Sequence, residues 1–373
     1  MSQKLFAASI FFFVLSIGIV AGCLPAWPQN VTITPLGAAA GEFCVGDRAL
    51  LFQDPTGVRV LIAPGRTVNG SGDPRIAPLG SIHVLLVDHP HVDHIGDVFH
   101  NNCAGTSTSP FAYPTAGNAP EIAARHNSAV LVAGEQNSFF IQKILDISGT
   151  APPSCPMTGL DNLFIVPRSS PCVSSLRGGT MTASINGISG VKVTTIPAWH
   201  SAGVTRAEID PPGVPVGLTG YAGSESGYIL RFTNGLSVLW TGDSGLIGDW
   251  AVQSQFYQPN LAVVHMGDIF TMGPDEAAFA VLNLIKPKMV IPEHANQVST
   301  SGGVVIPGTR VARLISQLPA AAVIVPLSGV PISCDGSGSC HQGKSDAGIE
   351  LQKIPEASRK TEIATSTPKL SSK

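Results

Sequence analysis

Hydrophobic positions in the first two thirds of the chain form short runs that are separated by turn residues. The apolar runs 49–53 and 58–63 flank Asp-Pro-Thr-Gly, and the runs 228–232 and 236–240 flank Asn-Gly, so both pairs predict β-hairpins. Later apolar runs alternate with segments of helical periodicity. Beyond the hairpins, strands are predicted at residues 31–35, 83–87, 129–133, 191–196, 289–291 and 322–325, and helices at residues 138–147, 274–285 and 311–318.

These elements indicate one α/β domain over residues 31–332, because neither a Gly/Ser linker nor a sharp change in charge divides it. Residues 101–120 have no helical period and predict a loop, and residues 149–179 are rich in Pro, Ser and Cys. We interpret the region from about 101 to 180 as an insertion into this domain. The polar residues 341–373, with only scattered apolar positions, predict a disordered tail.

The N-terminal residues 1–22 carry one charge, Lys4, ahead of an uncharged apolar run of 16 residues at 5–20. This run is shorter than a membrane span of about 20 residues and is typical of a secretory signal peptide. Val-Ala-Gly-Cys at 20–23 resembles a bacterial lipobox, which implies lipidation of Cys23. We expect an exported lipoprotein of the bacterial cell envelope, facing the periplasm or the cell surface. Plain secretion with an incidental Cys23 and a retained anchor helix are the alternatives.

Charged residues make up 13% of the 373 residues, about half the share of a typical soluble domain. The 40 Gly and 30 Pro are not periodic, which excludes collagen, and the supply of Val, Ile and Leu excludes a fully disordered chain. The formal net charge of −3 creates no strong field for nucleic acid, so we expect no nucleic-acid partner.

Six cysteines follow Cys23, and an even number in an exported protein favours disulfides over free thiols. The sequence contains no C-x-x-C spacing among them, so a zinc ribbon is not favoured. Six cysteines allow 15 pairings, and buried thiols are the other interpretation. Proximity in the sequence favours Cys334 with Cys340, Cys155 with Cys172 and, as the remainder, Cys44 with Cys103.

The segment Asp-His-Pro-His-Val-Asp-His at 88–94 follows a predicted buried strand directly. In a loop that leaves a strand, alternating residues can point at one spot, so His89 and His91 are expected to converge. Asp93 and His94 can point at an adjacent spot. Imidazole nitrogens and carboxylate oxygens are ligands for zinc, manganese or iron.

Three more potential ligands follow predicted strands: His200, Asp243 and His294. In open α/β sheets the carboxyl ends of the strands are where sites form. A surface patch of histidines would not be expected to repeat this placement three times. The sequence therefore predicts one metal site built from all these side chains.

This ordered set resembles the metal ligands of the metallo-β-lactamase superfamily, and the resemblance covers about residues 31–328. It implies an α/β fold of the four-layer αββα sandwich type with two divalent metal ions, zinc first and manganese or iron as alternatives. Residues 268–294 are similar to the branch that contains ascorbate-6-phosphate lactonase and uncharacterised metal-dependent hydrolases. The resemblance assigns the first metal to His89, His91 and His200, the second to Asp93, His94 and His294, and the bridging position to Asp243.

The chain departs from that branch at two places. Ile-Ala-Pro at 62–64 stands where Asp-Pro is frequent, so a supporting carboxylate is expected to be missing there. Asp88 stands where Ser or Thr is commoner. An aspartate at the bridging position 243 argues against a class B1 β-lactamase, which has Cys there.

The resemblance implies hydrolysis of an ester, lactone or phosphodiester by a hydroxide that bridges the two metals, with Asp93 and Asp243 as catalytic residues and Asp93 able to pass a proton. The expected partners are a small-molecule substrate and, through the lipid anchor, a membrane. Two alternatives remain, a non-catalytic metal-binding lipoprotein scaffold and β-lactamase-like amide hydrolysis. The sequence lacks a G-x-S-x-G elbow, a P-loop and a Rossmann fingerprint.

Two further residues near the predicted site have alternative roles. His265 either contacts substrate or packs in the structure, and packing is favoured. Trp199, next to His200, is expected to be a packed indole rather than part of a cleft.

Overall fold

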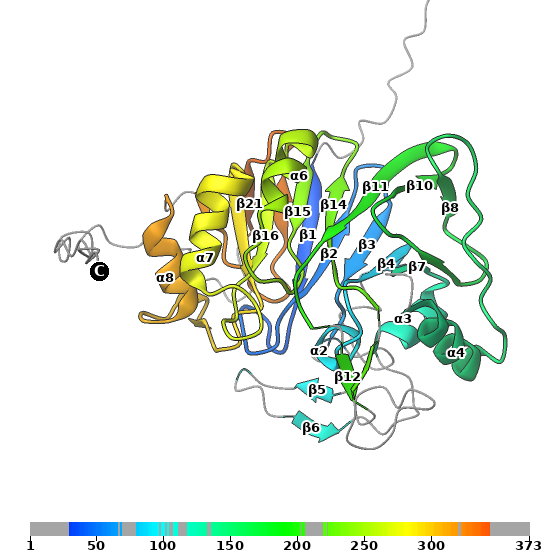
Figure 1. Cartoon of the computed structure of the whole chain (residues 1–373), viewed down its shortest axis with the longest axis horizontal. Helices are drawn as coiled ribbons and strands as arrows, with labels where there is room; N and C mark the ends of the chain where they lie inside the picture. Colours follow the sequence, from blue (N-terminus) through cyan, green and yellow to red (C-terminus); the bar gives the residue numbers. More distant parts are fainter. Residues whose placement is uncertain are drawn as a thin grey trace, which may run out of the picture.

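Two β-sheets form the centre of the molecule (Figure 1). The computed structural model describes residues 30–65, 68, 80–96, 98–100, 103, 107–110, 118–132, 136–201, 203–205, 219–221, 223–319 and 322–343. Within these residues the first sheet runs in the order β21 (Cys340–Gln342), β20 (Ile332–Cys334), β1 (Val31–Leu36), β2 (Ala49–Gln53), β3 (Arg59–Ile62), β4 (Val84–Val87), β7 (Ala129–Val132) and β9 (Cys172–Ser175). The second runs in the order β17 (Met289–Glu293), β16 (Leu261–His265), β15 (Ser237–Trp240), β14 (Ser226–Arg231), β11 (Ile188–Pro197), β10 (Thr180–Ile185) and β8 (Leu163–Val166).

Strands inside both sheets, such as β4, β7, β15 and β16, are buried on both faces, which explains why they are continuous apolar runs rather than alternating ones. In β2, Leu50 and Phe52 belong to the core between the sheets, together with Tyr228 and Trp240 of the second sheet. Leu51, between them, points to the opposite face and belongs to a separate core. The sheets are also joined by a hydrogen bond of 2.7 Å from the Tyr228 hydroxyl to a backbone carbonyl at the end of β4.

Helices cover the outer face of each sheet, and the two groups lie on opposite sides of the molecule (Figure 1). The core outside the first sheet includes Ile122 and Phe140, and the core outside the second includes Trp250, Ala277 and Leu314. This arrangement confirms the predicted αββα sandwich. The first group is α3 (Asn118–His126) and α4 (Asn137–Ser148), and the second is α6 (Asp249–Tyr257), α7 (Pro274–Phe279), the π-helical turn η2 (Ala280–Ile285) and α8 (Arg310–Gln317).

Small elements complete the described part of the chain. They are α2 (Val92–Ile95) and the paired strands β5 (Val98–His100) with β6 (Ser107–Pro110), β12 (Gly203–Thr205) with β13 (Thr219–Tyr221), and β18 (Thr300–Ser301) with β19 (Val304–Val305).

Most predicted elements are present, with shifted ends, and two predictions are wrong. Residues 322–325 form no strand; only one isolated bridge joins Val323 to Val290, and Pro326 follows directly. A proline has no N–H for a sheet ladder, which fits a chain that leaves the sheet here. Residues 101–120, predicted to be a loop, include β6 and the first turn of α3.

The three disulfides pair as proximity in the sequence favoured, Cys44–Cys103, Cys155–Cys172 and Cys334–Cys340. The Cys-containing stretch 149–179 contributes an edge strand to each sheet, since β9 pairs with β7 and β8 with β10. The predicted signal peptide and Cys23 lie outside the described residues, as does the predicted tail from residue 344 on. None of the helices in the described chain has the length and apolar character needed to cross a bilayer.

Candidate metal centre

The predicted ligands gather where strands of both sheets end. The loop 88–94 follows β4, and Asp243 and His294 follow the parallel strands β15 and β17. The start of β14 is tied to this loop by a hydrogen bond of 3.1 Å from Ser226 N to Asp88 O. His200 follows β11, which pairs with β14. The two sheets therefore bring residues more than 200 positions apart to one edge.

One group consists of His89, His91 and His200, whose ligand atoms lie within 4.8 Å of one another. His91 Nδ1 is 2.9 Å from His89 Nε2 and 3.3 Å from His200 Nε2. Ligands around a tetrahedral zinc ion with bonds of about 2.1 Å lie about 3.4 Å apart. The two distances from His91 Nδ1 lie near or below this spacing, so the three nitrogens surround a position that such an ion could take.

A second group consists of Asp93, His94, Asp243 and His294. Asp243 Oδ2 is 3.2 Å from His94 Nε2 and 3.1 Å from His294 Nε2. Asp93 Oδ2 is 3.8 Å and 3.4 Å from the same two nitrogens. Asp243 Oδ2 also lies 3.9 Å from His89 Nε2 and 3.8 Å from His200 Nε2, so this one oxygen borders both groups.

The outer ring nitrogens of four of these histidines are engaged by the protein, whereas His294 Nδ1 is buried without a hydrogen-bond partner. Asp88 Oδ2 is 3.0 Å from His89 Nδ1, and Asp88 Oδ1 is 2.8 Å from His94 Nδ1. His200 Nδ1 donates to Phe270 O at 2.8 Å, and His91 Nε2 donates to a backbone carbonyl at 3.0 Å. A proton held on the outer nitrogen leaves a lone pair on the inner one, as metal ligation requires. The donor set therefore fits divalent metal ions.

The two histidines that contact Asp88 differ in the direction in which their pKa is shifted. Burial alone would raise the pKa of the Asp88 carboxyl, but His94 and His89 lower it below its usual range. Burial lowers the pKa of His89 to about 4. At His94 the surrounding carboxylates outweigh burial and raise the pKa to about 10. His94 therefore holds a proton at neutral pH that a cation has to displace.

His265 lies behind Asp243 rather than at the surface. It is fully buried, and its Nδ1 is 2.7 Å from Asp243 Oδ1. Its Nε2 faces the Glu293 carboxylate at 3.6 Å. Burial raises the pKa of Glu293. Of its two expected roles, these contacts favour packing, with the added effect of orienting Asp243.

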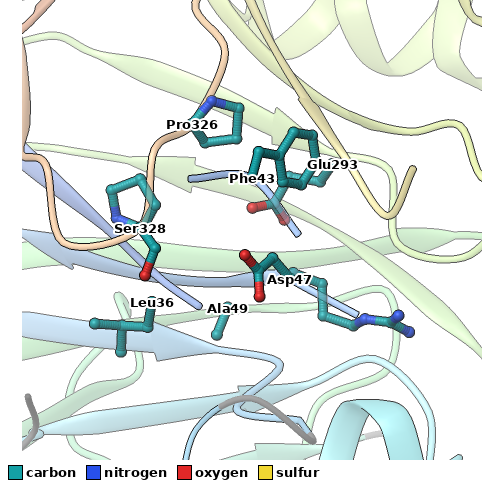
Figure 2. A pocket seen from close by; sticks show the side chains of 9 residues that line it. Leu36, Phe43, Asp47, Ala49, Glu293, Pro326 and Ser328 are labelled. Atoms are coloured by element: carbon teal, nitrogen blue, oxygen red, sulfur yellow. The ribbon is translucent and has the colours of Figure 1, made fainter. Parts of the chain in front are cut away.

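The sequence reasoning missed Arg48, which lies at the centre of the second group. Its guanidinium is 3% exposed, forms an ion pair with Asp93 and has Nη1 2.6 Å from His294 Nε2. A cation in this group and the guanidinium would occupy the same space, so the arginine has to move when the cation binds. A cavity behind it is also lined by Asp47 and Glu293, whose side chains face it in Figure 2. No sequence signal distinguishes a lone arginine ahead of a strand.

Trp199 contradicts its prediction, because its side chain is 70% exposed. The indole lies against Gly245, where an added Cβ would be 2.9 Å from the ring. The indole therefore lies against the backbone at Gly245 while most of the residue stays exposed.

The chain is similar to a known protein family and to several individual proteins. A family model described as a beta-lactamase superfamily domain matches residues 44–294. A UPF0173 metal-dependent hydrolase of Polynucleobacter asymbioticus is 30% identical over 262 residues, which cover 67% of this chain and 72% of that protein. Another from Cupriavidus necator is 28% identical over 288 residues, covering 74% and 83%. The solved structure of Igni18, a metallo hydrolase from Ignicoccus hospitalis, is 19% identical with a TM-score of 0.48, covering 84% of this chain and 99% of that one.

The family match spans more than half of the chain, and it contains all seven predicted ligands, from His89 to His294. Two packed sheets between two helical layers give the architecture that the resemblance implied. The chain therefore belongs to the metallo-β-lactamase superfamily.

Proposed function

We propose that this protein is a metal-dependent hydrolase with two cation sites that share Asp243. The observation that carries the proposal is the position of Asp243 Oδ2, between 3.1 and 3.9 Å from four imidazole nitrogens that belong to both ligand groups. The relatives named metal-dependent hydrolases support the class of reaction. Zinc is the favoured ion, and a His/Asp donor set also accepts manganese or iron.

Divalent ions at these positions would supply Lewis acidity and lower the pKa of water toward neutrality, which suits hydrolysis of an ester, lactone or phosphodiester. Within the chain, His89, His91 and His200 would hold one ion, and Asp93, His94 and His294 the other. Asp93 is the most exposed carboxylate of the cluster, at 24%, whereas Asp243 is 3% exposed. The Asp93 carboxylate is thus the one placed to accept a proton and pass it to solvent.

The test compares His91→Ala and Asp243→Ala with His126→Ala, a histidine on α3 outside the site. Turnover of bis-p-nitrophenyl phosphate or of a lactone should fall at least about 100-fold in the first two, since even outer partners of metal ligands cost up to about that factor. A chelator should abolish wild-type turnover, and zinc or manganese should restore it. Full activity in either variant with unchanged metal content would refute the proposal that two cation sites share Asp243. Stoichiometric metal without turnover of any ester, lactone or lactam would instead indicate a binding protein.

We also propose that the protein is exported and anchored through lipid on Cys23, from the apolar run 5–20 and the sequence that ends in this cysteine. The full chain should then fractionate with membranes when it is expressed in bacteria. Cys23→Ser should appear in the soluble fraction, and an unchanged distribution would refute lipidation.

A further inference from the structure

Exposed apolar side chains flank the metal ligand His200 on two sides. Trp199 precedes it in the chain and is 70% exposed. Ile269 and Phe270 are 85% and 66% exposed, and the Phe270 carbonyl accepts the hydrogen bond from His200 Nδ1. We call Trp199, Ile269 and Phe270 the apolar rim. Trp199 and Phe270 are thus joined through their backbones to a residue of the predicted reaction centre.

The backbone holds the Trp199 part of the rim in place. Trp199 N donates to Ser244 Oγ at 2.9 Å, and Gly245 N donates to Trp199 O at 2.9 Å. Both partners directly follow the ligand Asp243. Because any side chain at 245 would meet the indole, glycine allows the ring to lie there. The exposure of Trp199 is therefore part of an ordered arrangement around the site.

The other part of the rim has an unfavourable backbone. Asp268 and Ile269 have φ angles of 63° and 62°, in the left-handed region that a β-branched residue rarely adopts. Hydrogen bonds hold this turn, from Ile269 N to Asp268 Oδ1 at 3.0 Å and from Phe270 N to Asp268 O at 2.6 Å. The turn exposes two large apolar side chains as well as adopting a strained conformation. Strain that persists beside a reaction centre points to a role there.

We propose that the apolar rim binds an apolar acyl, alkyl or aryl group of the substrate, while the bond to be cleaved lies at the metal centre. The inference rests on the proposed hydrolase function and narrows its substrates to esters, lactones or phosphodiesters that carry such a group. Indole and phenyl rings provide large contact areas for hydrocarbon. Each methylene group removed from water contributes up to about a fourfold gain in kcat/KM.

The first experiment uses p-nitrophenyl acetate, butyrate and octanoate and follows only the turnover that a chelator abolishes. In the wild type, kcat/KM should rise with chain length. The ratio of kcat/KM for octanoate to that for acetate should fall about tenfold in Trp199→Ala and in Phe270→Ala. Phe256→Ala is the matched control, because Phe256 is 76% exposed near the end of α6 and outside the rim. A ratio that is the same in all four proteins would overturn the proposal.

A second variant separates binding from folding. Ile269→Asn places a residue that tolerates the left-handed conformation at φ 62°, so Tm should stay the same or rise. If the rim binds the substrate, the octanoate-to-acetate ratio should fall in the same variant, mainly through KM. A more stable variant with an unchanged ratio would show that Ile269 does not contact the substrate.

Binding of free octanoate, measured by calorimetry, separates this inference from the proposed function. If no ester, lactone, lactam or phosphodiester is hydrolysed but octanoate binds the wild type at least about tenfold more tightly than Phe270→Ala, the hydrolase proposal fails and the rim is supported. If esters are hydrolysed but neither octanoate binding nor chain-length preference depends on the rim, the hydrolase stands and the rim proposal fails.

Discussion

Asp88 provides a sharp test of the metal centre, because one buried carboxylate holds one ligand of each group. In Asp88→Asn, one oxygen becomes an amide nitrogen, which can only donate. The ring that faces this nitrogen has to present Nδ1 as acceptor, so its proton moves to Nε2 and blocks the lone pair that faces the metal. Loss of such outer partners typically lowers metal affinity about 10- to 100-fold. We expect that loss, about 1.4–2.8 kcal/mol, at the group that contains the affected histidine.

The matched control is Asp54→Asn. Asp54 is 1% exposed and accepts hydrogen bonds from Thr56 N at 2.9 Å and Thr233 N at 2.8 Å, in the turn between β2 and β3. This substitution should lower stability without lowering metal affinity. Affinity is measured by competition with a chromophoric chelator, with metal content from elemental analysis and folding from circular dichroism. Wild-type affinity at both sites in folded Asp88→Asn would refute the reasoning, as would an equal loss in Asp54→Asn.

Two other residues give predictions of a different kind. Arg48→Met should strengthen binding of the second cation about 10- to 100-fold, because no guanidinium then has to leave its charged partners. Metal titration measures this second binding step, and Arg59→Met is the control. An affinity of the second step that is unchanged or weaker in Arg48→Met would contradict the prediction. Burial lowers the pKa of His83 to about 4, and its Nδ1 accepts a hydrogen bond from Arg59 N at 3.1 Å. Between pH 6.5 and 4 only the unfolded chain binds this proton. The free energy of unfolding should therefore decrease as the pH is lowered from 6.5 to 4, by on the order of 2 kcal/mol after allowance for solvent screening. Urea unfolding with chelator at pH 7 and 4.5 should show less pH dependence in His83→Gln, and equal dependence would rule out this origin.

The fold could be predicted where burial on both sides of a sheet leaves a plain signal. Residues 49–53 form β2 with the predicted bounds, because Leu50 and Phe52 enter one core and Leu51 the other. The hairpin at Asn-Gly is also present, and Gly235 has the positive φ of 99° that the turn requires. Local composition is sufficient in both cases.

Other elements have no local signal. Helix α6 buries Trp250 and otherwise presents intermediate or exposed side chains, so it has no apolar stripe from which a helix could be predicted. Residues 322–325 have the apolar composition of a strand but contact β17 through a single bridge. Whether these residues form a strand depends on how far β17 extends beside them, and their local sequence does not encode that length.

The same division applies to the site. The seven candidate ligands could be proposed from the sequence because each has a side chain of a metal-binding type and is placed after a strand. The contacts that orient them depend on tertiary structure. Residues 62–64 lack the carboxylate expected in related proteins, and Asp88 supplies a carboxylate to His89 and His94 from a neighbouring position. The sequence shows that Asp88 departs from the residue type commoner in related proteins, but it does not show the contacts of Asp88 with His89 and His94.

The ligand cluster balances its charge with groups of the protein itself. Carboxylates removed from water are unfavourable without partners. Here the half-buried Asp93 pairs with Arg48, while the buried Asp88 and Asp243 contact His94, whose pKa is raised to about 10. A guanidinium and a proton therefore supply the positive charge that a divalent cation would bring. A cation that binds to the second group replaces the guanidinium and the proton. The affinity of this group for the cation is therefore set by the free-energy difference between the state paired with these groups and the state paired with the metal. The first group, with three imidazoles and no such cation among them, carries a smaller exchange penalty, and we expect it to be occupied first.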